Sequence, residues 1–243
     1  MQFTLLVTLL IGFISLFYSI AGQVGGAAFL AVMAFAGLPA EQMRPTALVL
    51  NVFAASYATW RLHRHGRIAW SLLWRIAIPS MLAAFIGGLF VPGGSLYYIM
   101  TGTLLIAASV LMLVKRDLDN AKRRQVRLAR AAPVGAVTGL LSGLTGIGGG
   151  VFLAPLIVAL GWASPRQAAG LSPPFILSNS VLALAGMLLS GQSVNPDVAF
   201  YASSAILGAM LGTFIGLRWM SDRATRYVLA AIMLFAGVRL LLR

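Results

Sequence analysis

The stretch GQVGGAAFL, Gly22–Leu30, breaks a long apolar run with glycines, and a related stretch, TGIGGGVFL, occupies Thr145–Leu153. In lipid, an unpaired backbone amide costs several kcal/mol, so such a break is tolerated only inside protein or beside a water-filled cavity. Two breaks at corresponding positions of two halves are typical of a transporter's substrate site. A shift of 123 residues places residues 24–36 on residues 147–159, with identities at Gly25, Gly26, Phe29, Leu30, Ala31 and Ala36.

The composition is that of a membrane protein. The 243 residues are 60% hydrophobic and 9% charged, and the mean hydropathy is +0.92. This apolar fraction exceeds what a soluble core needs, so we expect an all-α polytopic membrane protein. The net charge of +13 would suit a nucleic acid. The basic residues lie between apolar runs, however, where the positive-inside rule places them, so we expect no nucleic-acid partner. Cysteine is absent, which excludes disulfides and thiolate metal sites.

Apolar runs divide the chain into two halves of the same order. Each half begins with an apolar run, a glycine break and a short apolar segment. A helix needs roughly 20 residues to cross a bilayer, so the short segment cannot cross alone. Three longer spans follow it. The first half, 1–114, holds runs 3–21, 27–37, 45–60, 70–90 and 96–114, and the second, 131–243, holds runs 131–144, 151–161, 169–190, 197–217 and 225–242. The polar segment between them, 115–130, holds seven Lys or Arg, and we expect it to be a cytoplasmic linker.

Small residues recur at four-residue spacing in corresponding spans of the two halves. Small residues at this spacing let helices approach closely in lipid. The match supports an internal duplication independently of the glycine breaks. The two sets are Ser80, Ala84 and Gly88 in the first half and Gly208, Gly212 and Gly216 in the second.

The distribution of Lys and Arg indicates the topology. If residues 131–161 return to the same side as a hairpin, 14 of the 18 Lys and Arg lie inside, and if they cross as one broken span, 12 do. The positive-inside rule therefore favours the hairpin version. It predicts two inverted repeats, each a broken helical hairpin plus three transmembrane helices, which a hydropathy count would report as seven or eight spans. Whether residues 1–37 and 131–161 are re-entrant hairpins or single broken spans stays open at this point.

Enzyme motifs are absent from the sequence. It lacks HExxH, GxSxG and Walker A patterns, and its acidic residues fall in loops or at the ends of spans. His63 and His65 lie in one basic loop without a nearby carboxylate, which is a poor metal site. We therefore expect no enzymatic activity, no cofactor and no metal.

The glycine breaks suit a small anion. Half-helices that start near Ala27 and Val151 would direct their N-termini, each with roughly half a positive charge, at the middle of the membrane. Glycine lets an anion approach the backbone amides closely. The alternative is that these glycines only permit tight helix packing. The expected backbone contacts come from Gly25, Gly26, Gly148, Gly149 and Gly150.

Polar side chains near the breaks complete the candidate site. An amide in the bilayer is costly unless it is bonded, so Asn51 and Asn179 are expected to face the interior, either as substrate ligands or as bonds between helices. Gln23 lies inside the first break, where its side chain would reach a substrate. The other candidate hydrogen-bonding residues are Thr46, Thr145 and Ser172.

These residues resemble a known family. GIGGGVFLAPL at residues 146–156, Gly161 and PRQAA at residues 165–169 are similar to the second-half motif of the TauE/SafE-type sulfite exporter family of membrane permeases. In the first half, Gly25-Gly26, RPTALVLN at 44–51, WR at 60–61 and GRIAW at 66–70 also match. The first copy departs from the pattern, because Ala27 replaces a third glycine and Val32 stands where the second copy has Pro155. The resemblance implies transport of small anions, often sulfur oxyanions or organosulfonates such as sulfite, across the bacterial inner membrane.

Two hypotheses about function follow. The first is a secondary transporter that moves a small anion by alternating access, driven by a gradient because no ATPase motif exists. A proton or another coupling ion is compatible with this hypothesis, and the substrate itself could carry the proton. The second is a non-transporting assembly or scaffold subunit of the membrane, in which the glycines serve packing alone. Substrate identity, transport direction and oligomeric state stay open.

Overall fold

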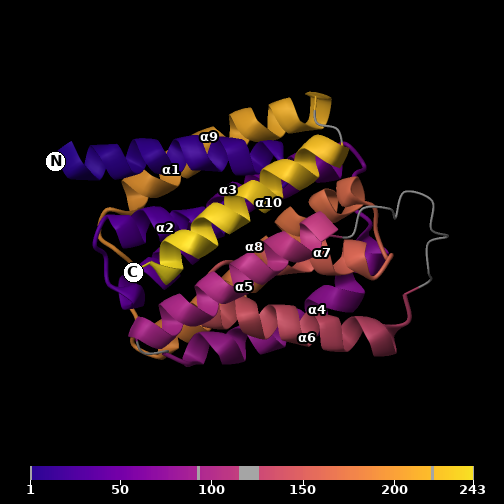
Figure 1. The fold of residues 1–243 in the computed structure, drawn as a ribbon, viewed down its shortest axis with the longest axis horizontal. Coiled ribbons are helices and arrows are strands. Elements are labelled where there is room, and N and C mark those ends of the chain that lie inside the picture. The colour runs from indigo at the N-terminus through magenta and orange to yellow at the C-terminus, as the bar shows by residue number, and fades with distance from the viewer. Residues whose placement is uncertain (1, 92–93, 115–125, 220–221, 243) are drawn as a thin grey trace.

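The computed structural model describes residues 2–91, 94–114, 126–219 and 222–242. These residues form helices without strands, as expected for the predicted all-α fold. Both termini lie at the same end of the bundle, on the left in Figure 1. The helices are α1 (Gln2–Ile20), α2 (Gly26–Phe35), α3 (Ala40–Arg64), α4 (Trp70–Leu89), α5 (Gly94–Val114), α6 (Leu128–Thr145), α7 (Gly150–Ala159), α8 (Pro165–Leu189), α9 (Val198–Trp219) and α10 (Asp222–Leu241).

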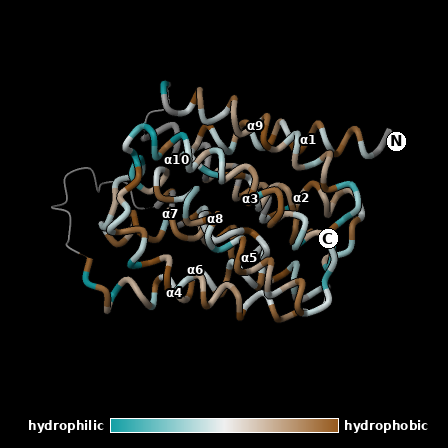
Figure 2. The backbone as a smooth tube through the Cα atoms, turned by 180° about the vertical axis from the view of Figure 1, so that it is seen from behind, coloured by the Kyte–Doolittle hydropathy of each residue, from teal (hydrophilic) through white to brown (hydrophobic). Residues whose placement is uncertain are grey.

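The outer surface is that of a polytopic membrane protein. Large apolar side chains point outward along the outer helices, among them Phe13 of α1, Leu82 of α4 and Leu207 of α9, which are 62%, 65% and 62% exposed. Figure 2 shows hydrophobic residues along the helices and hydrophilic residues toward their ends. Among the described residues, α4, α8 and the segment Val198–Gly216 are long and apolar enough to cross a membrane, and shorter apolar helices accompany them. The count of seven or eight spans stays a prediction.

The main helix contacts join helices of the first half to helices of the second half. Helix α1 packs along α9 of the second half, and its counterpart α6 packs along α4 of the first half. The corresponding helices α3 and α8 contact each other, as do α5 and α10. The α5–α10 pair is antiparallel, because Gly102 lies against Gly237 while Ser109 bonds to Ala230. Two halves that run in opposite directions would give this pattern, which supports the predicted inverted repeats.

Glycines bring paired helices of the two halves into backbone contact. A Cβ atom on Gly139 of α6 would collide with the carbonyl oxygen of Ser80, and one on Gly143 with that of Ala84. On the other side of the bundle, Gly212 and Gly216 of α9 meet the carbonyl oxygens of α1 in the same way. The small residues predicted to allow close packing therefore do so, and this close approach favours helix association in lipid.

Each glycine break turns its half-helix back toward the end from which it came. Thr4 at the start of α1 bonds to Asp197, and Asn195 of the same loop bonds to Gln42 near the start of α3. Helices α1 and α3 thus begin at one end, which supports the hairpin version for residues 1–37. At the opposite end, Arg75 bonds to Val126 beside the start of α6, and Gly170 near the start of α8 touches Arg67.

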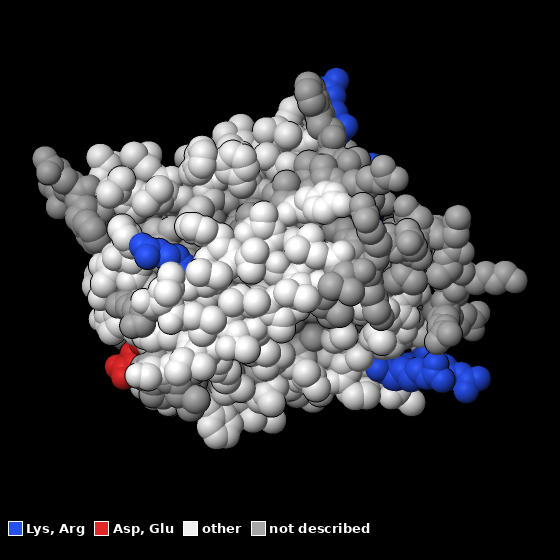
Figure 3. All heavy atoms as spheres, viewed as in Figure 1, with Lys and Arg blue, Asp and Glu red and all other residues white. Residues whose placement is uncertain are grey.

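We name the two ends after a buried and an exposed arginine. The Arg44 end is where α1 and α3 begin and where α4 and α8 finish. The Arg67 end is where α3 finishes and where α4, α6 and α8 begin. On the face drawn in Figure 3, basic side chains project at the right-hand end, and both basic and acidic surface lies toward the left.

The two breaks have the same backbone conformation. The residues that correspond in the structure are offset by one position from those that the sequence identities pair. Gly22 and Gly146 are left-handed, with φ of 72° and 77°, and left-handed Gly25 and Gly149 cap α2 and α7. Gly25 therefore corresponds to Gly149, a shift of 124 residues, whereas the sequence identities favoured 123. The shift of 123 residues gives the most identical residues. The fold instead aligns the glycines at which the backbone is left-handed before each helix, because glycine adopts this conformation without strain.

Candidate functional site

The two glycine breaks meet at the centre of the bundle. Gly26 lies against the carbonyl oxygen of Ile147 and the side chain of Asn51. The Asn51 Nδ2 atom donates a hydrogen bond of 3.0 Å to Ile147 O, which fixes α3 to the second break. Gly148 packs beside the same amide and beside Ser180 Oγ. The sequence prediction that both breaks form one site is consistent with this contact.

Backbone N–H groups around both breaks have no acceptor within the described part of the chain. All of these residues are buried, and a buried N–H group without a partner costs about 1–3 kcal/mol. They concentrate positive potential where α2 and α7 begin. A small oxyanion offers the acceptors that these groups lack. The groups belong to Val24, Gly25, Gly26 and Ala27 in the first break and to Gly148, Gly149, Gly150 and Val151 in the second.

Gln23 connects the first break to the second half. Its side chain is 1% exposed, and Nε2 donates a hydrogen bond of 2.9 Å to Ser172 Oγ of α8. Ser172 in turn donates to the carbonyl oxygen of Ala168, also at 2.9 Å. Gln23 Oε1 has no partner among the described residues and lies close to Gly150 at the start of α7. A protonated oxyanion or a water molecule could donate to this oxygen.

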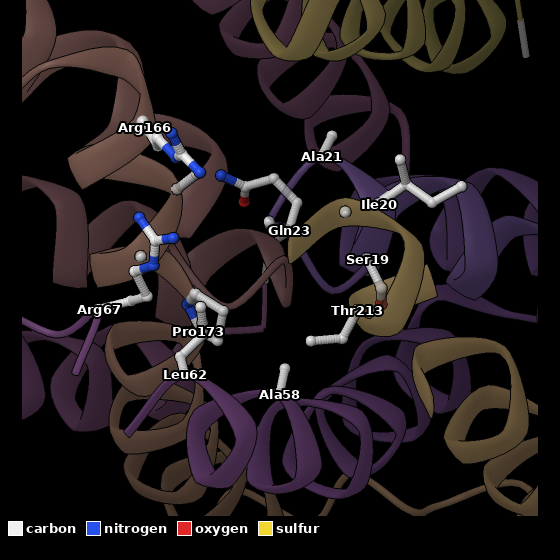
Figure 4. Close-up of a pocket in the computed structure, with 14 residues that line it drawn as sticks. Ser19, Ile20, Ala21, Gln23, Ala58, Leu62, Arg67, Arg166, Pro173 and Thr213 are labelled. Atoms are coloured by element: carbon white, nitrogen blue, oxygen red, sulfur yellow. The ribbon is translucent and has the colours of Figure 1, made fainter. Parts of the chain in front are cut away.

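A cavity of about 60 Å³ leads from the Arg67 end to Gln23. Arg67 and Arg166 are exposed at its outer part, and Pro173 and Thr213 line its wall. Figure 4 shows the guanidinium groups of both arginines on the same side of the cavity as the Gln23 amide. This volume exceeds the 10–15 Å³ or so that one water molecule needs. The described lining includes two cations and no carboxylate, so it attracts anions.

Several predicted site residues lie elsewhere or serve the fold. Thr46 lies at the Arg44 end, where its Oγ1 atom accepts a hydrogen bond of 2.9 Å from Asn195 N. Asn179 accepts a hydrogen bond of 2.9 Å from Ser80 Oγ and donates to Phe175 O, so it joins α4 to α8 as the packing interpretation expected. Thr145 Oγ1 accepts a hydrogen bond from Ile147 N, which shapes the second break. The binding roles of all predicted residues stay predictions.

One buried arginine lies in a helix where the sequence predicts a loop. The apolar run 45–60 predicts a helix that starts at Pro45 and leaves Arg44 in the loop before it, but α3 begins at Ala40 and Arg44 lies in its first turns. Arg44 is 1% exposed and is held by groups from α4, α6 and Gln192. Proline suits the first turn of a helix, which led to the wrong start, although an earlier start with Glu41 in the first turn also fits.

The arginines of the cavity were also missed as site residues. Arg67 and Arg166 entered the predictions only through the count of Lys and Arg and as parts of the motifs GRIAW and PRQAA, because each lies between two predicted spans. Their approach to Gln23 depends on the contact between the end of α3 and the start of α8. Among the described residues, no three His, Asp or Glu side chains group closely enough to hold a metal ion.

Comparisons with known proteins agree with this architecture. The family model "Sulfite exporter TauE/SafE" matches residues 5–240. A "Probable membrane transporter protein" of Sinorhizobium fredii, y4hK, is 31% identical over 232 residues, which are 94% of each chain. A protein of the same description from Haemophilus influenzae is 28% identical over 226 residues, or 86% of this chain and 83% of that protein.

A third relative, "Probable membrane transporter protein MJ0441" of Methanocaldococcus jannaschii, is 26% identical over 196 residues, which are 74% of this chain and 73% of that protein. No solved structure matches the chain significantly. The family model and the first relative both cover nearly the whole length, including both glycine breaks. This chain is therefore a member of the TauE/SafE sulfite exporter family, a family of membrane transporters and not of enzymes.

Proposed function

We propose that this protein is a secondary transporter that moves a small oxyanion, with sulfite or an organosulfonate as the favoured substrate, by alternating access. The observation that carries the proposal is the set of buried N–H groups without acceptors at Gly25–Ala27 and Gly148–Val151. Backbone donors at two helix N-termini bind an anion without a charged side chain. The preference for sulfur comes from the family description alone.

The cavity provides a path for the anion from one side. Arg67 and Arg166 would raise the local concentration of anions at the outer part of the cavity. Gln23 lies at its inner end, next to Gly150 and the second break. The Arg44 end is closed by the hydrogen bonds of Arg44 to Gln192 and to two backbone carbonyls. One open and one closed end are what one state of an alternating-access cycle requires.

We assign the Arg67 end to the cytoplasm of the bacterial inner membrane. Among the residues whose side chains are described, the acidic residues Glu41 and Asp197 lie at the Arg44 end, and Arg44 and Arg239 are the basic residues near that end. By the positive-inside rule, the end with more Lys and Arg faces the cytoplasm. The basic residues with described side chains at the Arg67 end are Arg61, Arg64, Arg67, Arg75, Arg127, Arg130, Arg166 and Arg218.

A gradient drives the transport in this proposal. The sequence holds no nucleotide-binding motif. The free Gln23 Oε1 atom accepts a hydrogen bond from a hydroxyl group, as a protonated oxyanion such as bisulfite would offer. Such a substrate would carry its own proton across the membrane. Coupling to proton movement then needs no carboxylate within the spans.

Flux through purified protein in liposomes tests the proposal. We expect sulfite uptake above that of empty liposomes, saturable in sulfite and faster when a pH gradient favours the protonated anion. Sulfate, phosphate and taurine serve as a panel that ranks the substrate class. A folded protein that moves none of these anions under any gradient would contradict the proposal and favour a scaffold role.

A further inference from the structure

Arg44 is a buried cation whose bonds to described residues are all to neutral oxygens. Its Nη1 atom donates to Gln192 Oε1 at 3.1 Å, and its Nη2 atom donates to Phe90 O at 3.2 Å and to Gly143 O at 2.9 Å. Its Nε atom has no partner among the described residues, and no carboxylate appears among its described bonds. A buried charge without a counter-charge is costly, and in a membrane protein it marks a functional position by default.

The internal repeat makes Arg44 equivalent to a residue that lines the cavity at the Arg67 end, which we call the open cavity. Helices α3 and α8 are both 25 residues long, and a shift of 125 residues lays Arg44 on Ala169. The neighbours agree, because Gly146 packs on Arg44 just as its counterpart Gly22 packs on Ala169. Ala169 lines the open cavity, so the position of Arg44 is the equivalent lining position at the other end.

The partner of Arg44 has a counterpart in the open cavity as well. Gln192 N bonds to Met187 O at 3.1 Å, and Arg67 N bonds to Leu62 O at 3.0 Å in the same turn, again 125 residues apart. Arg67 lines the open cavity, while Gln192 is 5% exposed and bonded to Arg44. Of each pair of equivalent positions, one therefore holds an arginine, which is Arg44 at one end and Arg67 at the other.

We propose that Arg44 binds the anion in a second vestibule, which opens at the Arg44 end in the opposite state and is closed in this structure. This inference rests on the proposed transport function. In the closed state, the guanidinium donates its hydrogen bonds to the neutral oxygens of Gln192, Phe90 and Gly143. When the end opens, a small oxyanion replaces them and forms two charge-assisted hydrogen bonds to the planar guanidinium, which are stronger than bonds to neutral acceptors.

The neutral partners make this exchange possible. A carboxylate at the position of Gln192 would pair with Arg44 and compete with the substrate, whereas an amide oxygen is displaced more easily. The Tyr97 ring, 5.8 Å from the Arg44 guanidinium carbon, stabilises the cation without competing for its N–H groups. A purely structural arginine that fastens α3 to α4 and α6 would not need a displaceable partner.

The substitution Gln192→Glu separates the two roles. Glutamate has nearly the same shape and places a carboxylate beside Arg44, so a structural role would be kept or strengthened. We expect the variant to fold and to melt at a higher temperature without anion. If Arg44 binds the substrate, the half-saturating sulfite concentration for access from the Arg44 end should rise at least about tenfold, because an ion pair must now be broken. Access from the Arg67 end should change little.

Membrane vesicles of the two orientations give this side-specific readout. Sulfite uptake into right-side-out vesicles reports access from the Arg44 end, and uptake into everted vesicles reports access from the Arg67 end. Gln42→Glu is the matched control, since it adds the same charge at the same end on a half-buried side chain bonded to Asn195. A second variant, Arg44→Gln, should show the same side-specific loss if it folds.

The outcomes separate this inference from the proposed function. If wild-type vesicles show no sulfite flux, the proposed function fails. If the wild type transports sulfite but Gln192→Glu has unchanged half-saturation from both sides, Arg44 does not bind the anion and the inference is overturned. An equal loss from both sides would also overturn it, because it would indicate a general defect rather than a second vestibule.

Discussion

Gln23 Nε2 donates a 2.9 Å hydrogen bond to Ser172 Oγ, and this bond joins the first glycine break to α8 of the other half. Both residues are buried, and Gln23 also borders the cavity from the Arg67 end. One side chain thus contacts the open path, the second break and a long helix of the second half. Under the proposed function, a residue in this position would contact the anion and both halves of the protein.

The variant Gln23→Leu should keep the fold and lose transport. Leucine fills a similar volume but removes the amide that faces the cavity and leaves Ser172 without its donor. We expect sulfite flux to fall roughly tenfold or more, as the loss of a buried polar contact of 1–3 kcal/mol would give. Flux in proteoliposomes measures this effect. Ser203→Ala is a control for expression and reconstitution, because Ser203 is exposed and its described hydrogen bond lies within its own helix. Unchanged flux in Gln23→Leu would remove Gln23 from the site.

The variant Gly149→Val tests the glycine break itself. Gly149 has φ of 79°, and a Cβ atom there would lie 3.0 Å from the Ser142 side chain and 3.1 Å from the Phe175 ring. We expect transport to be abolished, because valine both strains the left-handed turn by roughly 1–2 kcal/mol and fills the space beside the backbone amides. Sulfite flux per folded protein is the measurement.

Gly161→Val is the matched control for backbone strain. Gly161 is also left-handed, with φ of 69°, but nothing lies within 4 Å of its Cβ position. The control should therefore be destabilised to a similar extent and still transport sulfite. Equal flux in the two variants would mean that the Gly149 break is not part of the substrate path.

Much of the fold could be predicted from apolar runs and small residues. The runs located most helices within a few residues, and the spacing of Ser80, Ala84 and Gly88 located a close helix contact. The start of α3 was wrong because Pro45 gave a strong local signal, whereas the helix is fixed by tertiary contacts of Arg44 with α4 and α6. Local propensity is a weak guide where packing decides.

The candidate site was only partly predictable. Gln23 and Ser172 were both expected near the anion, and they bond to each other. Thr46 could not be told apart from Ser172 by sequence, because which face of a helix meets the centre depends on its rotation in the bundle. Arg67 and Arg166 are far apart in the chain, so their shared cavity appears only once α3 and α8 are packed.

The variant Gly139→Ala should destabilise the protein even though alanine favours helix. Alanine is about 1 kcal/mol better than glycine inside a helix, which alone would stabilise α6. At this position a Cβ atom collides with the backbone oxygen of Ser80, and overpacking of this kind costs typically 1–3 kcal/mol. We expect a lower melting temperature in detergent. Val137→Ala, an exposed neighbour on the same helix, should leave it nearly unchanged. A rise for Gly139→Ala would contradict the tight α4–α6 contact.

Neutralising the arginines of the cavity should weaken capture of the anion more than turnover. In Arg67→Gln and Arg166→Gln, we expect the half-saturating sulfite concentration to rise several-fold at low salt while the maximal flux changes little. The difference from wild type should shrink at high ionic strength, because salt screens exposed charges. Arg64→Gln removes an exposed charge that stacks on Trp60 and is not among the residues that line the cavity. An identical effect in this control would indicate a general surface charge effect.

Single cysteines should label from opposite sides of the membrane. The chain has no cysteine, so each introduced thiol is the only target for a membrane-impermeant maleimide. Glu41→Cys lies exposed near the start of α3 at the Arg44 end, and His65→Cys lies exposed just after α3 at the Arg67 end. We expect Glu41→Cys to react in intact spheroplasts and His65→Cys to react only in everted vesicles, because the Arg67 end carries more of the positive charge. Labelling of both from one side would contradict a membrane-spanning α3, and the reverse pattern would place the open cavity outside.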